Sequence, residues 1–311
     1  MDTFSEDYFR DDNAARAYLE ALRWPEGPVC AHCGSMRKPY AIKPAGVYRC
    51  AEPECRKNFT VTMNTPMERS HIALHKWLQA FHLMVSSKKG ISAHQLHRTL
   101  KITYRSAWFM AHRVRECMRT GGISPLGGPG KIVEADETYY GKTEEPRVSK
   151  QRRGRPYAVG SRGPRDKRPI VALVERGGEV RTFHVPVANK ENVMAIVNEN
   201  VLKETRLHTD ESKLYWGAEK HFASHETVKH SAHEYARGDV HTNSAEGYFS
   251  IFKRGMTGVY QHCAEKHLHR YLAEYDFRYN TRSKLGIEDG ERAALAIKNA
   301  TGKRLTYRQS H

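Results

Sequence analysis

Two acidic side chains lie in segments with the pattern of β-strands. Asp136 is in the middle of the segment 131–141, and Asp210 is the last residue of the segment 206–210. Because side chains alternate along a strand, Glu134 and Asp136 project to one side of the first segment and Glu137 to the other. Asp136 is therefore expected to face a catalytic surface, with Glu134 as a same-side neighbour that could substitute for it.

A third acidic or amide ligand is expected at the start of a later helix, where the sequence offers Asn243 and Glu246. Glu246 and Lys253 are seven residues apart and share one helix face, whereas Asn243 is rotated away from Lys253 by about 80° at roughly 3.6 residues per turn. This geometry favours Glu246 as the ligand and Lys253 as a cation directed at the DNA backbone. Alternatively, Asn243 and Glu246 form a capping box that only starts the helix.

Carboxylates on adjacent strands are typical ligands of magnesium in sites of phosphoryl transfer. Mg²⁺ prefers hard oxygen ligands, keeps several waters and binds substrate phosphates. Two such ions about 3.5–4 Å apart can activate an attacking oxygen and stabilise a leaving one. We therefore expect Asp136, Asp210 and Glu246 to bind Mg²⁺ or Mn²⁺, with Asn243 as the alternative third ligand.

Four of the six cysteines have the spacing of a second metal site. Cys30 and Cys33 form a CxxC pair followed by a glycine, and Cys50 and Cys55 form a pair that is two residues wider. Tetrahedral zinc needs four soft ligands, which two turns can supply, so we expect a zinc ribbon. His32 lies inside the first pair and is expected to point outward. A redox CxxC is disfavoured because no βαβ pattern surrounds it.

The segment 70–119 has a helical pattern that fits a DNA-binding helix-turn-helix. A first helix is followed by a short helix over 93–100, a turn at 101–103 and a third helix over 104–118. The third helix carries three arginines that we expect to contact DNA: Arg105, Arg113 and Arg115. The alternative is a plain helical linker with a solvated basic face.

A basic loop is expected over residues 143–168, which are rich in lysine, arginine, glycine and proline. Its phosphate contacts would come from Arg152, Arg153 and Arg155, unless the loop is an idle solvated tip. A hairpin over 169–185, a helix over 189–201 and the strand ending at Asp210 follow. This order of three strands, a helix and another strand predicts a mixed α/β sheet of RNase-H-like type, flanked by helices.

Composition indicates a polyanionic partner. The chain has 311 residues with a formal net charge of +16 and a pI of about 9.6, which favours nucleic acid. No segment has the apolar length of a membrane span, and the acidic N-terminus does not resemble a secretory signal. We expect a cytoplasmic, nucleoid-associated protein. The expected parts are an N-terminal helix at 1–28, a zinc ribbon at 29–62, the helix-turn-helix at 70–120, a catalytic domain at 130–285 and a C-terminal tail at 286–311.

Several of these stretches together resemble bacterial insertion-sequence transposases, which combine an N-terminal zinc ribbon with an ISXO2-like, RNase-H-like DDE-type integrase domain. The similar stretches are 134–139 (EADETY), 208–210 (HTD), 241–247 (HTNSAEG), 253–255 (KRG), 260–262 (YQH), 266–271 (KHLHRY) and 277–282 (FRYNTR). With the ribbon they span nearly the whole chain. The resemblance implies two Asp ligands, a Lys and a third ligand that is either Asn or Glu.

The resemblance also implies a DNA transposase that cuts at element ends and joins 3′ hydroxyls to target DNA. Its partners would be double-stranded terminal inverted repeats, target DNA and further copies of the chain. Further contacts to DNA are expected from Arg254, His267, Arg270, Arg278 and Arg282. Rival hypotheses are an inactive DNA-binding remnant or regulator, a structure-specific nuclease of the same fold and an RNA-binding zinc-ribbon protein.

Overall fold

The protein folds into two compact units. The first comprises residues 1–120 and 281–311, and the second comprises residues 121–280. The computed structural model describes residues 4–119, 124–144, 166–232, 234 and 236–305. Arg152, Arg153 and Arg155 lie outside the described residues, so their phosphate contacts stay a prediction.

The first unit begins with a short 3-10 helix, η1 (Asp7–Phe9), and the helix α1 (Asp12–Arg23). The N-terminal helix expected within residues 1–28 is divided because Asp11 caps α1. The Asp11 side chain accepts hydrogen bonds from the backbone N–H groups of Asn13 and Ala14, both at 2.9 Å. An aspartate at this position satisfies donors that the first turn of a helix leaves without partners.

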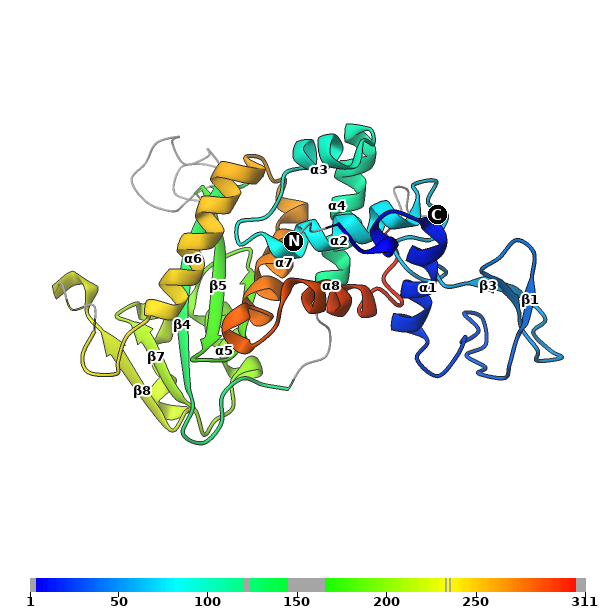
Figure 1. The fold of residues 1–311 in the computed structure, drawn as a ribbon. Helices are drawn as coiled ribbons and strands as arrows, with labels where there is room; N and C mark the ends of the chain where they lie inside the picture. Colours follow the sequence, from blue (N-terminus) through cyan, green and yellow to red (C-terminus); the bar gives the residue numbers. More distant parts are fainter. Residues whose placement is uncertain (1–3, 120–123, 145–165, 233, 235, 306–311) are drawn as a thin grey trace, which may run out of the picture. The chain divides into compact units, whose positions relative to one another are not determined.

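The zinc-ribbon segment forms a small antiparallel sheet in the order β1-β2-β3 (Figure 1). The strands are β1 (Tyr40–Ile42), β2 (Val47–Arg49) and β3 (Asn58–Thr60). Phe59 on β3 is buried at 1% exposure and stacks on Tyr48 of β2, with ring centroids 5.7 Å apart. Short strands of this length depend on such contacts and on the knuckles that flank them.

Three helices follow at the positions expected from the sequence: α2 (Leu74–Ser86), α3 (Ala93–Leu100) and α4 (Tyr104–Met118). Ser92 and Thr103 cap α3 and α4 by accepting from the backbone N–H groups of Gln95 and Ser106. Lys101 adopts the left-handed conformation, with φ of 50°, that ends α3.

The segment expected as a C-terminal tail contributes to the first unit. It contains the helix α8 (Asp289–Lys298), which packs against α2. Buried Arg292 on α8 donates to the carbonyl of Val85 at 3.2 Å and to the carbonyl of Thr281 at 2.7 Å. The charge pattern of α8 does not indicate this role, because α2, which is distant in sequence, determines which side of α8 is buried.

The second unit is built on a five-stranded mixed sheet in the order β6-β5-β4-β7-β8. Its strands are β4 (Ile132–Lys142), β5 (Lys167–Glu175), β6 (Val180–His184), β7 (Arg206–Asp210) and β8 (Ser224–Val228). β4 pairs with β5 in antiparallel and with β7 in parallel orientation. The sheet with its helices confirms the expected RNase-H-like α/β class, and it places β4 in the centre.

Helices cover both faces of this sheet (Figure 1). α5 (Lys190–Asn200) shares a buried core with Val133 and Ala135 of β4. α6 (Asn243–Gly255) and α7 (Leu268–Asn280) pack on the opposite face, against the side chains of β5 that point to their side. Alternation along β4 therefore directs Glu134 and Asp136 toward α6, because Val133 and Ala135 face α5.

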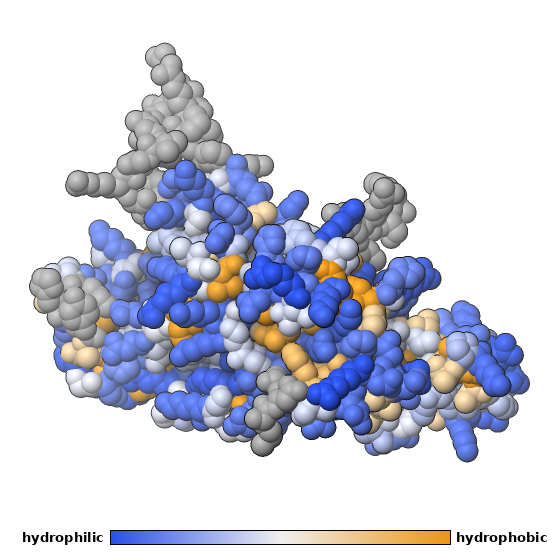
Figure 2. Space-filling model, turned by 45° about the horizontal axis from the view of Figure 1, so that its top comes forward, coloured by the Kyte–Doolittle hydropathy of each residue, from blue (hydrophilic) through white to orange (hydrophobic). Residues whose placement is uncertain are grey.

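Hydrophilic residues cover most of the face seen in Figure 2, and the hydrophobic ones lie in separate small areas. Within the described part of the chain, no helix is both long enough and apolar enough to cross a membrane. The helices of the second unit instead bury their apolar sides on the sheet.

Candidate active site

The parallel pairing of β4 and β7 brings the two strand aspartates together. The register pairs Glu134 with His208, and two residues further along both strands are Asp136 and Asp210. Neighbouring strands lie about 4.8 Å apart, so side chains at matching positions are direct neighbours. The sheet thereby places two acids that are far apart in sequence on neighbouring strands.

The acids act on one another electrostatically. Burial, together with the negative charges of Glu137, Asp210 and Glu246, raises the pKa of Asp136 to about 8. A hydrogen bond from the backbone N–H of Glu137, at 2.8 Å, opposes this shift. Like charges held together in a half-buried place disfavour ionisation, and a divalent cation would relieve this repulsion.

α6 carries Glu246 and Lys253 on its exposed side, and Asn243 is its exposed first residue. The negative charge of Glu246 contributes to the raised pKa of Asp136, which places this carboxylate in the electrostatic surroundings of the aspartate. α6 runs along β4 in the strand's own direction. Its start lies at Glu134, and its later residue Phe252 meets the ring of Tyr140, with centroids 5.5 Å apart.

The alternative hypothesis, a capping box formed by Asn243 and Glu246, is wrong. The N-cap of α6 is Thr242, whose side chain makes no capping hydrogen bond. Glu134 of β4 takes this role, because its carboxylate accepts from the backbone N–H groups of Ser244 at 2.8 Å and Ala245 at 3.1 Å. A cap supplied by a distant strand leaves no local sequence signal. Glu134 is thus engaged at the helix start and is not a substitute for Asp136.

Glu137 lies on the other face of β4 and anchors the segment after Asp210. It accepts hydrogen bonds from Tyr215 Oη at 3.0 Å and Ser212 Oγ at 3.2 Å. Burial raises its pKa, and the charge of Asp210 raises it further. Sequence reasoning assigned Glu137 no role. A signal was available, since a glutamate on a buried strand face must find a partner.

In this arrangement of side chains, the carboxylates of Asp136, Asp210 and Glu246 do not form a complete set of metal ligands. One group of at least three His, Cys, Asp or Glu side chains in the described part of the chain could hold an ion. It consists of the four cysteines Cys30, Cys33, Cys50 and Cys55. Asp136, Asp210 and Glu246 are assembled on one face without closing around a common point. Their donor type fits Mg²⁺ or Mn²⁺, which would bind with waters and substrate phosphates as further ligands.

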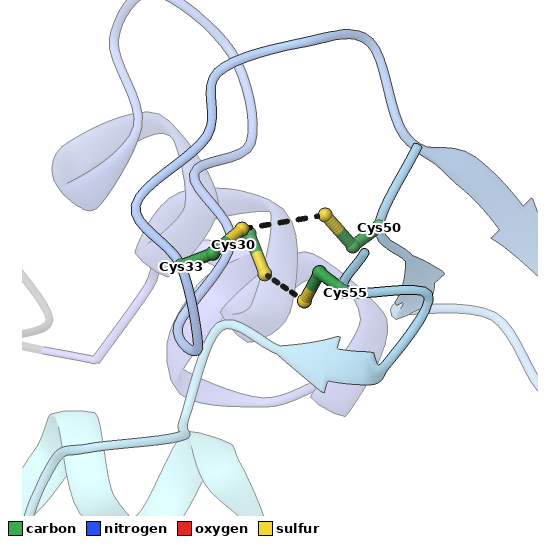
Figure 3. Close-up of side chains that lie close together, drawn as sticks. All are labelled: Cys30, Cys33, Cys50 and Cys55. Carbon is green, nitrogen blue, oxygen red and sulfur yellow. Dashed lines mark hydrogen bonds between the residues drawn. The ribbon is translucent and has the colours of Figure 1, made fainter. Parts of the chain in front are cut away.

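The four cysteines point toward one another (Figure 3). Their sulfur atoms all lie within 4.8 Å of one another. The Sγ atoms of Cys30 and Cys55 are 3.8 Å apart, and those of Cys33 and Cys50 are 3.6 Å apart. A zinc ion with Zn–S bonds of about 2.3 Å requires tetrahedral edges of about 3.8 Å. The spacing therefore fits a four-cysteine zinc site.

The wider second pair is accommodated in a turn. In each knuckle the N–H of the first cysteine donates to a carbonyl two residues beyond the second cysteine, from Cys30 to Ser35 and from Cys50 to Lys57, both at 3.0 Å. The two additional residues are absorbed between Glu52 and Arg56, where both Cys55 and Arg56 donate to the Glu52 carbonyl. His32 is not a ligand, since its ring bonds to the carbonyl of Asn58 at 3.0 Å.

The arginines of α4 have different surroundings. Arg105, in the first turn, is exposed. Arg113 donates to the carbonyls of Pro66 at 2.7 Å and Leu305 at 3.2 Å, and Arg115 is only 3% exposed. The expected DNA contacts of Arg113 and Arg115 are therefore not available in this structure, because the second half of α4 is packed into the first unit.

The residues on and next to α6 and α7 that were expected to contact DNA also differ in their surroundings. Arg254 is exposed, and His267 and Arg270 are half-buried and bonded to each other at 2.7 Å. Arg278 is buried and forms an ion pair with Glu274, one turn earlier on α7. The expected phosphate contact of Arg278 is therefore wrong, because its charge is neutralised inside the unit.

Comparisons with known proteins extend this description. A family model described as ISXO2-like transposase domain matches residues 125–280, and one described as transposase zinc-ribbon domain matches residues 10–58. An uncharacterized protein in the transposable element ISH50 of Halobacterium salinarum is 26% identical over 291 residues, which cover 90% of this chain and 95% of that protein.

Solved structures give weaker similarities. The Mos1 transposase paired-end complex with the left transposon end is 12% identical, with a TM-score of 0.29, over 72% of this chain and 75% of that chain. The simian T-cell lymphotropic virus intasome in complex with PP2A regulatory subunit B56 gamma is 15% identical, with a TM-score of 0.29, over 58% and 67%. The assignment therefore rests on the sequence matches. With just over half of its length matched, the chain belongs to the ISXO2-like transposase domain family.

Proposed function

We propose that this transposase cleaves DNA at the ends of a mobile element and joins the resulting 3′ hydroxyls to target DNA. The observation that carries the proposal is the position of Asp136 and Asp210, each two residues beyond the paired Glu134 and His208 on adjacent parallel strands. They lie on the face covered by the helix that carries Glu246. Family membership supports the same reaction class.

The proposed site has three acidic members and one cation. Asp136, Asp210 and Glu246 would bind the catalytic divalent ions, and Lys253, two turns after Glu246, would contact the DNA backbone. Bound Mg²⁺ or Mn²⁺ would supply an activated oxygen nucleophile and stabilise charge on the leaving oxygen. Glu246 is the better third ligand, because its charge acts on Asp136 while Asn243 lies about one turn earlier, at the first residue of α6.

The chemistry consists of two phosphoryl transfers. Water attacks the phosphorus at the element end, the bond to the 3′ oxygen breaks, and a 3′ hydroxyl and a 5′ phosphate result. That 3′ hydroxyl then attacks a phosphorus in the target strand and releases a new 3′ hydroxyl there. The protein residues hold the phosphate and the nucleophile in line, which is the main contribution that a protein makes to such reactions.

The first unit would bind the element ends. The exposed side chains around the α3–α4 turn include Arg98, Lys101, Tyr104 and Arg105. A helix-turn-helix contacts DNA mainly through the first residues of its second helix, and Arg105 occupies that position. The four-cysteine site, with zinc bound, would hold the ribbon in shape, because such small sheets depend on their metal.

The decisive experiment uses purified protein, Mg²⁺ and labelled DNA with the flanking ends of the gene. Wild type is compared with Asp136→Ala for 3′-end nicking, for joined product and for binding of the same DNA. Nicked and joined products in wild type alone, with binding retained in the variant, would support the proposal. Nicking without joining would indicate a nuclease, and binding without nicking in Mg²⁺ or Mn²⁺ would indicate an inactive regulator.

A further inference from the structure

Glu134 is a fully buried acid of the second unit that lies beside the proposed site. Its side chain is 0% exposed, and it lies two residues before Asp136 on the same face of β4. It accepts hydrogen bonds from four donors: Ser244 N, Ser244 Oγ, Ala245 N and Arg176 Nε, at 2.8, 3.1, 3.1 and 2.7 Å. Three of these donors belong to the first turn of α6.

We propose that Glu134 is a positioning residue, whose carboxylate fixes the start of α6 on β4 and thereby sets where Glu246 stands relative to Asp136. The inference rests on the proposed function, because it assigns a role in assembling that site. The connection is short: Asp136 lies two residues after Glu134 on the strand, and Glu246 directly follows Ala245 on the helix.

A charged carboxylate suits this place for two reasons. The N-terminus of a helix presents unpaired N–H groups and a partial positive charge, so an anion there is stabilised. Arg176, in the turn between β5 and β6, supplies a full positive charge at 2.7 Å from Glu134. A buried charge without such partners would be costly.

Arg176 also forms hydrogen bonds with the residues that precede α6. Its Nη1 donates to the carbonyl of Asp239 at 2.6 Å, and its Nη2 donates to the carbonyl of His241 at 3.0 Å and to His241 Nδ1 at 2.9 Å. Glu134 and Arg176 therefore hold both the chain that leads into α6 and its first turn. Further along, contact between Phe252 and Tyr140 gives α6 a second fixed point on β4.

The variant Glu134→Gln tests the proposal with little change in volume. In glutamine, an NH₂ group replaces one of the two carboxylate oxygens. This NH₂ group cannot accept a hydrogen bond, so at least one N–H donor loses its partner. Loss of a residue that orients a metal ligand typically costs 10–100-fold in metal affinity or activity. We expect the Mn²⁺ concentration for half-maximal nicking to rise by about this factor, with activity recovered at high Mn²⁺.

Hydrogen exchange of the backbone amides provides a measurement that is independent of activity. In the metal-free protein, exchange at Ser244 and Ala245 is expected to be at least about tenfold faster in Glu134→Gln. Both amides donate to Oε2 of Glu134, and a neutral glutamine oxygen at that place accepts more weakly than a carboxylate oxygen. Ser244→Ala keeps the carboxylate and removes one donor, so it should produce a smaller shift in the same direction. This variant also keeps the test available if Glu134→Gln does not fold.

Glu274→Gln is the matched control. Glu274 is equally buried, at 0% exposure, and forms an ion pair with Arg278 within α7 of the same unit. Its loss should lower the melting temperature without changing the Mn²⁺ midpoint or exchange at Ser244. The proposal is overturned if Glu134→Gln behaves like this control. If wild type does not nick DNA, the proposed function fails, and exchange at Ser244 and Ala245 still decides whether Glu134 holds α6.

Discussion

At the residue scale, Asp136 is the side chain on which the other acids act. Its pKa is raised to about 8 by burial and by three negative neighbours. The folded protein therefore disfavours the ionised form of Asp136, an arrangement that favours function over stability. Catalysis and stability should respond in opposite ways when this charge is removed.

Asp136→Asn should reduce nicking by at least about a hundredfold, because a metal ligand is lost while the shape is kept. The melting temperature of the metal-free variant should equal or exceed that of wild type, because the repulsion is removed. Gel assays of nicking and calorimetry without metal would measure both effects. A clear fall in melting temperature would show that the Asp136 carboxylate has a structural role instead.

The third ligand can be tested with two variants of one helix. Glu246→Gln should lose nicking by about 10–100-fold, because a charged ligand becomes neutral. Asn243→Ala should keep most of the activity, since Asn243 contributes no charge near Asp136. Nicking rates at several Mg²⁺ concentrations would measure the difference. The opposite order of the two losses would assign the ligand to Asn243.

At the scale of elements, the ribbon and α6–α7 depend on different buried groups. The ribbon is a sheet of three short strands joined by a cluster of sulfur atoms. The α6–α7 pair is tied to β6 by Asp276, which accepts from Tyr248 Oη at 2.6 Å and from the backbone N–H of Thr182 at 3.0 Å. Each element therefore has its own chemical test.

Zinc removal should unfold the ribbon. Binding energies of structural zinc are about 10–16 kcal/mol in small zinc-finger peptides, which exceeds what such a sheet can supply by packing. We expect one zinc per chain by elemental analysis, and we expect Cys55→Ser to lose it together with binding of element ends. Cys263→Ser is the control, because Cys263 lies in the second unit and should leave the zinc content unchanged.

Asp276 should make stability depend on pH. Burial raises its pKa to about 7, above the ordinary value, so the folded state binds this proton more tightly than the unfolded chain. The contribution is complete below about pH 4 and is lost as pH rises to about 7. Urea unfolding at pH 5 and pH 8 should show this loss, on the order of 2–3 kcal/mol at about 1.4 kcal/mol per pKa unit. Asp276→Asn should remove most of that difference, and an unchanged difference would refute the assignment.

At the scale of the whole molecule, the net charge of +16 should govern DNA binding. Affinity for DNA falls with salt in proportion to the number of phosphates contacted. Assembly of several copies of the chain stays a prediction. Two of the three arginines of α4, Arg105 and Arg113, allow the overall charge to be separated from specific contacts.

Arg105→Ala should weaken binding to element ends and reduce the salt slope by about one, because Arg105 is an exposed residue in the first turn of α4. Arg113→Ala removes the same charge from the same helix but should mainly lower stability, since its guanidinium bonds to the carbonyls of Pro66 and Leu305. Binding measured between 50 and 200 mM salt would compare them. Equal slopes in both variants would contradict this assignment.

The sequence by itself determined the features that depend on local rules. The helices over 93–100 and 104–118, the hairpin over 169–185 and the paired cysteines follow from spacing and side-chain type. Alternation along β4 also predicted the face on which Asp136 lies, and the strand order led to the mixed sheet. These inferences held because each requires information from only a few neighbouring residues.

The tertiary structure decided which partners distant residues find. It gave the cap of α6 to Glu134, bonded Arg113 to the carbonyl of Pro66, buried Arg115, and packed α8 against α2. A hydrogen bond between residues 110 positions apart leaves no periodic pattern in the chain. A charged side chain likewise looks the same in sequence whether it faces solvent or a buried partner, and only the packing of the elements distinguishes the two.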